Sequence, residues 1–99
     1  MYYAQSLVGK TVTLRTATGE EIITDLLGVD PDNHLLSVQN PRVVGLNNEQ
    51  EQQVVLMPYV LTAETLSVTI DARNVLSVME TAENTAGEYK NLISEENHR

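Results

Sequence analysis

The chain has 99 residues, with 14 acidic and 6 basic side chains, a formal net charge of −8 and no cysteine. A domain of this length forms a core without a disulfide or metal, and the missing cysteines exclude thiolate zinc sites and thiol nucleophiles. The acidity argues against tight, sequence-independent binding of nucleic acid, which depends on Lys and Arg.

The N-terminal third predicts two strands. In residues 11–16, Val12 and Leu14 alternate with polar residues, which is the period-2 pattern of a half-buried strand. The segment before it, residues 1–6, has room for about one helical turn or an irregular arm. After a turn that contains a glycine, residues 21–29 form the return strand, whose two apolar pairs indicate a central position covered on both sides for part of its length.

A polar loop follows at Asp30-Pro31-Asp32-Asn33-His34. Proline lacks an amide hydrogen, and Asp and Asn favour turns through hydrogen bonds from side chain to backbone. A third strand is predicted at residues 35–44. Because Pro41 cannot donate a hydrogen bond to a neighbouring strand, this half of the strand lies at an edge or contains a bulge.

An extended β-hairpin is predicted at residues 39–61. Its turn is the polar stretch 45–51, which contains Gly and Asn, and its second arm is a fourth strand at residues 52–61. After a bend, alternating apolar and polar residues predict a strand at 66–70, and a turn at 71–74 leads to the last strand at 75–79.

The last segment, residues 81–99, is an acidic C-terminal tail separate from the domain at residues 1–80. Tyr89, Leu92 and Ile93 are spaced as one face of a helix, so a short amphipathic helix within residues 86–96, docked on a neighbour, competes with plain disorder.

Two segments, in the same order, resemble the sequence motifs of the Sm and Sm-like (LSm) family, to which Hfq is related. The first match comprises Gly9-Lys10-x-Val12-x-Leu14, Gly19, Ile22, Leu26, Gly28-Val29-Asp30 and Leu35. The second is Ile70-Asp71-Ala72-Arg73-Asn74-Val75-Leu76-Ser77-Val78, which is similar to the family's Ile-Arg-Gly-Asn-x-Val-x-x-Ile motif.

The resemblance implies an all-β fold, in which a strongly bent five-stranded antiparallel sheet forms a small barrel. A helix normally precedes the first strand in this family, but residues 1–6 leave room for little or no N-terminal helix, and the extended β-hairpin is more than a minimal member needs. It also implies a homo-oligomeric ring of about five to seven subunits. Strand edges that alternate apolar residues without guarding charges favour pairing with another chain. The candidate interface residues lie in the last two predicted strands: Leu66, Val68, Ile70, Val75, Leu76 and Val78.

The polar loop has three interpretations. It is a simple turn, or a pocket for an RNA base, or a metal site, although its spacing matches no calcium loop. The resemblance implies RNA binding at the pore face by Asp30, Asn33, His34, Arg73 and Asn74.

Three positions depart from the family pattern. Asp71-Ala72 replaces Arg-Gly and so removes a cation. Asp32 stands at the usual aromatic stacking position, and Thr24 replaces a glycine that lets the second strand bend.

The sequence contains no motif that is typical of an enzyme, because it has only two histidines and neither a Gly-rich phosphate loop nor a nucleophile elbow. We expect no cofactor, no metal and no small-molecule substrate. No apolar run of about 18 residues and no secretory signal is present, so we expect a cytoplasmic protein without a membrane partner. The predicted function is RNA binding or RNA chaperoning by the ring. The alternative is a structural or adaptor ring that contacts proteins through the hairpin and tail.

Overall fold

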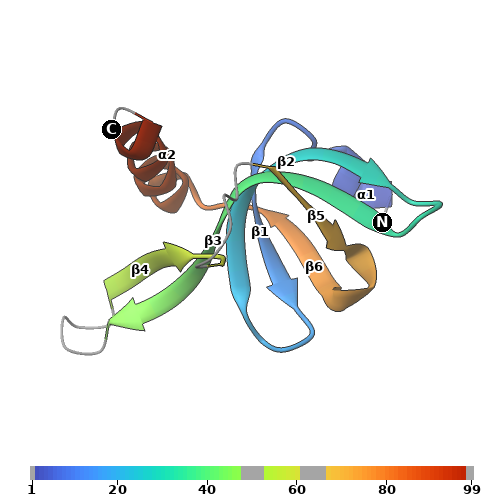
Figure 1. The fold of residues 1–99 in the computed structure, drawn as a ribbon, viewed down its shortest axis with the longest axis horizontal. Coiled ribbons are helices and arrows are strands. Elements are labelled where there is room, and N and C mark those ends of the chain that lie inside the picture. Colours follow the sequence, from blue (N-terminus) through green and yellow to red (C-terminus); the bar gives the residue numbers. More distant parts are fainter. Residues whose placement is uncertain (1, 48–52, 61–66, 98–99) are drawn as a thin grey trace.

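Six antiparallel strands form one strongly bent sheet in the structure, a computed structural model that describes residues 2–47, 53–60 and 67–97 (Figure 1). The elements in chain order are α1 (Tyr2–Gln5), β1 (Thr11–Thr16), β2 (Glu21–Asp30), β3 (Leu35–Asn47), β4 (Gln53–Pro58), β5 (Ser67–Asp71), the 3-10 helix η2 (Ala72–Asn74), β6 (Val75–Glu80) and α2 (Glu83–Asn97). The strand order is β4-β3-β2-β1-β6, and β5 pairs with β3.

All six strand segments predicted along the chain are present, whereas the resemblance implied a five-stranded sheet. The long strand β3 pairs in two parts. Residues 35–39 of β3 pair with β5, whereas residues 42–47 pair with β4. The second part is the predicted extended hairpin, which projects away from the rest of the sheet (Figure 1).

Among the described strands no pairing joins β5 to β6, so the sheet is strongly bent but not closed into the predicted barrel. The two strands are connected by the 3-10 helix η2 (Figure 1). Among the described strands, β5 and β6 therefore each keep one unpaired edge.

The alternation of β1 places its apolar residues in the core as predicted. Val12 and Leu14 are fully buried, whereas Arg15 is exposed. The fully buried side chains around them come from β2 and β3: Leu26, Leu36 and Val38. The central position of β2 is confirmed at Ile22 and Ile23, which are both buried. The second apolar pair of β2 is covered on one side only, because Leu27 lies in a bulge and is exposed.

Two bulges bend β2 and β3. One lies where the register shifts between Leu26 and Gly28, and the other between Ile23 and Asp25. A bulge bends the strand and increases its twist. Opposite the second bulge, Asn40 has a positive φ of 51°, and the hydroxyl group of Thr24 donates to the Gln39 carbonyl at 2.7 Å. The predicted irregularity at Pro41 is thus a bulge, and a threonine hydrogen bond supports the bend where the family prefers glycine.

The ends of the chain are helical. The N-terminal helix α1 is a single turn, as predicted. The C-terminal segment forms α2, which has 15 residues and packs on this chain's own β3. The prediction that this helix docks on a neighbour was therefore wrong, because the buried Tyr89 contacts the bend of the same chain. No helix in the described part of the chain is long and apolar enough to cross a membrane.

Candidate functional site

Two polar segments that are far apart in sequence meet at one end of the sheet. The backbone amide of Ala72 donates to the carbonyl oxygen of His34 at 2.8 Å, which joins the loop between β2 and β3 to η2. His34 and Arg73 line a shallow surface hollow of about 520 Å³ together with Ala4 of α1. The rest of its lining is Ala72, Val75, Leu76, Ser77 and Val78. We call residues 30–34 and 71–74 the loop end.

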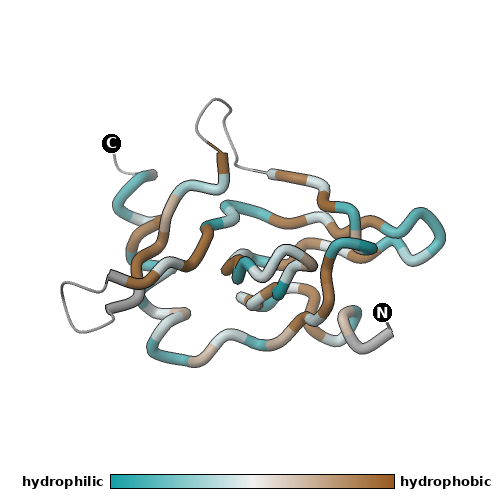
Figure 2. The backbone as a smooth tube through the Cα atoms, turned by 90° about the horizontal axis from the view of Figure 1, so that it is seen from below, coloured by the Kyte–Doolittle hydropathy of each residue, from teal (hydrophilic) through white to brown (hydrophobic). Residues whose placement is uncertain are grey.

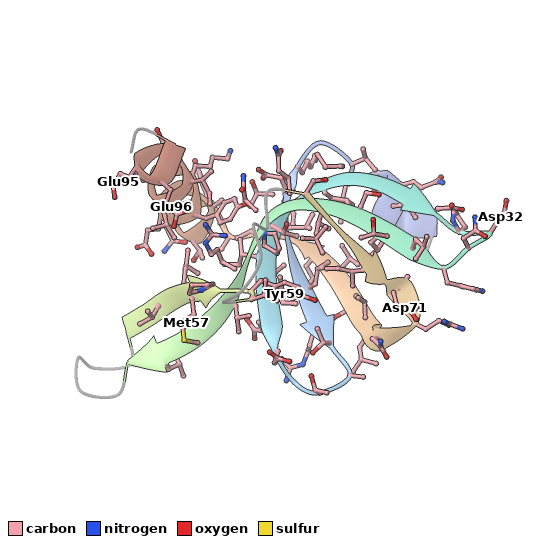
Figure 3. The ribbon with its side chains drawn as sticks, viewed as in Figure 1. Asp32, Met57, Tyr59, Asp71, Glu95 and Glu96 are labelled. Carbon is pink, nitrogen blue, oxygen red and sulfur yellow. The ribbon has the colours of Figure 1, made fainter. Side chains whose placement is uncertain are left out.

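The loop at residues 30–34 holds itself in shape. The Asp30 carboxylate accepts hydrogen bonds from the backbone amide of Asn33 at 3.3 Å and from its Nδ2 at 2.8 Å. These bonds, led by the one from the Asn33 side chain, lower the pKa of Asp30. His34 has a positive φ of 57° and an exposed side chain, and Asp32 lies at the exposed tip (Figure 3).

An ion pair at the start of η2, between Arg73 and the capping residue Asp71, determines how Arg73 is presented. Asp71 binds Nε of Arg73 at 3.0 Å and Nη2 at 2.8 Å, and it also caps η2 by accepting from the Arg73 amide at 2.9 Å. Hydrogen bonds from the Arg73 side chain and then its amide lower the pKa of Asp71 to about 2. Both groups are at the surface (Figure 3). Asp71 is thus an acid that neutralises the nearby cation Arg73.

Of the five predicted RNA-binding residues, the structure brings His34 and Arg73 together in the hollow. Asp30 and Asn33 bond to each other in the neighbouring loop and do not line it. Asn74 lies at the end of η2, where its carbonyl accepts from the Ala17 amide at 2.8 Å. The sequence did not indicate Ala4 or Ser77 as part of this hollow, because residues of this kind carry no distinctive signal.

Most of the basic side chains are paired with acids. Four ion pairs lie within the described residues: Lys10–Glu80, Arg15–Glu21, Arg42–Glu96 and Arg73–Asp71. Lys90, on α2, is the described cation outside these pairs. The described part of the chain contains no group of three or more side chains that suits a metal ion.

The predicted interface residues fall on the two strands with free edges. Val68 and Ile70 of β5, and Val75 and Val78 of β6, are partly buried against this chain's own core. Leu76 points outward with a relative exposure of 68%. Leu66 lies outside the described residues.

A second polar cluster lies at the opposite end of the molecule, where β3 bends at residues 39–42 and α2 packs against it; we call it the elbow. The buried Tyr89 hydroxyl donates to the carbonyls of Gln39 at 3.1 Å and Asn40 at 2.9 Å. Burial, and then the charge of Asp25, raises the pKa of Tyr89, so its phenol stays a donor. Arg42 donates to the Pro41 carbonyl at 3.0 Å and pairs with Glu96.

The similarity of this chain to known proteins lies in its fold. No family model matches the sequence, and no curated protein matches it. Solved structures do match. A heptameric archaeal Sm protein aligns with a TM-score of 0.56 and 16% identity over 83% of this chain and 100% of its own. The SmAP1 heptamer of P. aerophilum aligns with a TM-score of 0.55 and 16% identity over 82% and 90%. With its strongly bent antiparallel sheet, this chain has the Sm-like fold.

Proposed function

We propose that this protein assembles into a homo-oligomeric ring and binds single-stranded RNA at the loop end. The observation that carries the proposal is the 2.8 Å hydrogen bond from Ala72 to His34, because it holds the two candidate segments side by side. The proposed role is binding rather than catalysis, and we expect it in the cytoplasm.

The ring is supported by two unpaired strand edges, one on β5 and one on β6, which lie at different places in the sheet. β5 pairs only with β3 and β6 only with β1 among the described strands. An unpaired edge is a template for another strand, and pairing two different edges head to tail generates a closed ring when the rotation closes. The two similar archaeal proteins are heptamers.

RNA binding is supported by the chemistry of the hollow. An exposed imidazole can stack on or hydrogen-bond to an unstacked base, and a guanidinium can bind phosphate. The net charge of −8 and the paired cations oppose this binding. We therefore expect modest affinity that falls steeply with salt.

Fluorescence anisotropy with short U-rich, A-rich and mixed RNAs, at two salt concentrations and on protein of known native mass, tests the proposal. His34→Ala and Arg73→Ala should each weaken binding about tenfold, which is the effect of losing about 1.4 kcal/mol. Asp71→Asn should strengthen binding, because it removes an acid and releases Arg73. The matched control is Lys90→Ala, which removes an exposed cation on α2 and should change affinity little.

A ring that binds none of the RNAs at low salt would disprove the RNA role and move the function to protein assembly. Equal losses for Arg73→Ala and Lys90→Ala would show that binding follows net charge and not the hollow. A monomeric native mass would disprove the ring.

A further inference from the structure

The described strands of the hairpin beyond Arg42 form an uncharged arm on an acidic molecule. The arm comprises the described residues 43–47 of β3 and 53–58 of β4, and none of them is charged, whereas the whole chain carries −8. Leu46, Val55 and Met57 are exposed on it. Figure 2 shows apolar strands at this end of the molecule and hydrophilic residues in the loop at the opposite end. Apart from Glu49 and Glu51 in the sequence that connects its strands, the arm therefore adds no charge repulsion when it meets a second copy of this chain.

Both faces of the arm are apolar. The register places Val43 opposite Met57 and Gly45 opposite Val55 on one face, and Val44 opposite Leu56 on the other. Met57 lies over Gly45, where an added Cβ would come within 2.7 Å of the methionine Cε atom. A two-stranded ribbon of this kind is only marginally stable in water by itself. Additional strands would bury its exposed apolar side chains.

The outer edge of β4 is open and unguarded. Among the described strands β4 pairs only with β3. Natural proteins protect such edges with charges, proline or bulges, but the sequence Gln53–Pro58 contains no charge and its proline stands at the last position. The ring proposed above uses the edges of β5 and β6, so it leaves the edge of β4 without a partner.

We propose that β4 pairs with β4 of a second copy of this chain, antiparallel and about a twofold axis, so that two arms form one four-stranded sheet. A twofold contact of this kind uses the same surface on both partners, and this surface is uncharged in each. The antiparallel direction also puts the Gln53 ends of the two β4 strands at opposite ends of the contact, and Gln53 is the end that follows Glu49 and Glu51 in sequence. A parallel pairing would put the two Gln53 ends side by side.

One arm offers only a small contact area, so the pairing becomes strong only when several arms act together. Stable protein interfaces bury about 800 Å² per partner, which exceeds what one edge of a six-residue strand provides. In a ring every subunit carries one arm, and several weak contacts act together. The pairing thus rests on the proposed ring for its strength and joins two rings through their arms.

The native mass of the full chain, measured by light scattering and native mass spectrometry, tests this pairing. The expected mass is two rings, and Val55→Lys should halve it by placing a charge in the paired edge. Val8→Lys is the matched control, because Val8 and Val55 are 43% and 39% exposed, and it should leave the mass unchanged. Thermal melts of both variants check that they are folded.

Cysteine cross-linking gives a second readout. Because the chain has no cysteine, single substitutions at Val54, Val55, Leu56 and Met57 report only on the new thiol. A disulfide-linked dimer from at least one β4 position, and none from Val8→Cys, supports the pairing even if the subunit is not in a ring.

Three results would overturn the proposed β4 pairing, and each can be distinguished from a failure of the proposed ring. A single-ring mass for the unmodified chain with no β4 cross-link excludes the pairing. So does an unchanged double-ring mass for Val55→Lys, since another surface would then join the rings. A fall to monomers in Val55→Lys would place the arm in the ring interface itself.

Discussion

The loop end and the elbow both satisfy their polar groups, but they do so over different distances in sequence. At the loop end, Asp30 bonds to Asn33 and Asp71 to Arg73, with partners two or three residues apart. At the elbow, Tyr89 and Glu96 bond to residues 49 to 54 positions away. Figure 3 shows the separation, with Asp32 and Asp71 far from Glu96. The loop end therefore depends on the local chain, whereas the elbow depends on the docking of α2.

The largest difference in effect between the elbow and the loop end is expected for Tyr89→Ala. Removing a fully buried aromatic side chain costs about 3 kcal/mol, and this cost falls on the docking of α2 rather than on the distant loop end. Hydrogen exchange of residues 83–97 should become fast, and the helical circular dichroism signal should fall. The amides of Asn33 and Arg73 should keep their protection.

The control for that change is Tyr89→Phe, which keeps the ring and removes the hydroxyl that donates to Gln39 and Asn40. Two partly buried carbonyls then lose a donor, which costs about 1 kcal/mol. Equal hydrogen exchange of α2 in Tyr89→Phe and Tyr89→Ala would show that the hydroxyl group alone holds the helix in place. Faster exchange at the loop end would contradict the independence of the two regions.

A smaller effect is expected for Glu96→Gln. The Arg42 side chain is 9% exposed and its partner Glu96 is 46% exposed, so solvent screens the pair from one side. We expect a loss of about 0.5 to 1 kcal/mol in α2 docking, measured by the same exchange experiment. Glu95→Gln removes the same charge from the next, exposed position of α2 and should change the exchange little. The same result for both variants would mean that the pair contributes only through net charge.

The features that the sequence predicted are those that depend on local patterns. The alternation around Val12 and Leu14 predicts β1 because strand burial follows a period of two. Pro31 and its neighbours predict the loop because their preference for turns acts within a few residues. The Asp71–Arg73 pair was not predicted, although opposite charges two residues apart in a turn can meet.

The elbow was not predictable in the same way. The spacing of Tyr89, Leu92 and Ile93 defines an apolar helix face but not the surface it covers. The carbonyls that receive the Tyr89 hydroxyl are exposed to it only because β3 bulges at Asn40. Pro41 predicted an edge or a bulge in this strand, but not the register between β2 and β3 that sets where the carbonyls of Gln39 and Asn40 lie. The open sheet between β5 and β6 is likewise a result of three-dimensional pairing.

The smallest effect, and the one confined to the loop end, is the titration of Asp71. Its pKa is lowered to about 2 from 3.8, so the pair stabilises the fold above pH 3.8 and loses this contribution as the pH falls through about 2. Because both groups are at the surface, the melting temperature at neutral pH should hardly change in Arg73→Ala. The carboxyl chemical shift of Asp71 is the sensitive measurement. In Arg73→Ala its midpoint should rise but stay below 3.8, because the amide of residue 73 still donates to it. Tyr89→Ala should leave this midpoint unchanged, and a shift there would show that the loop end senses the elbow after all.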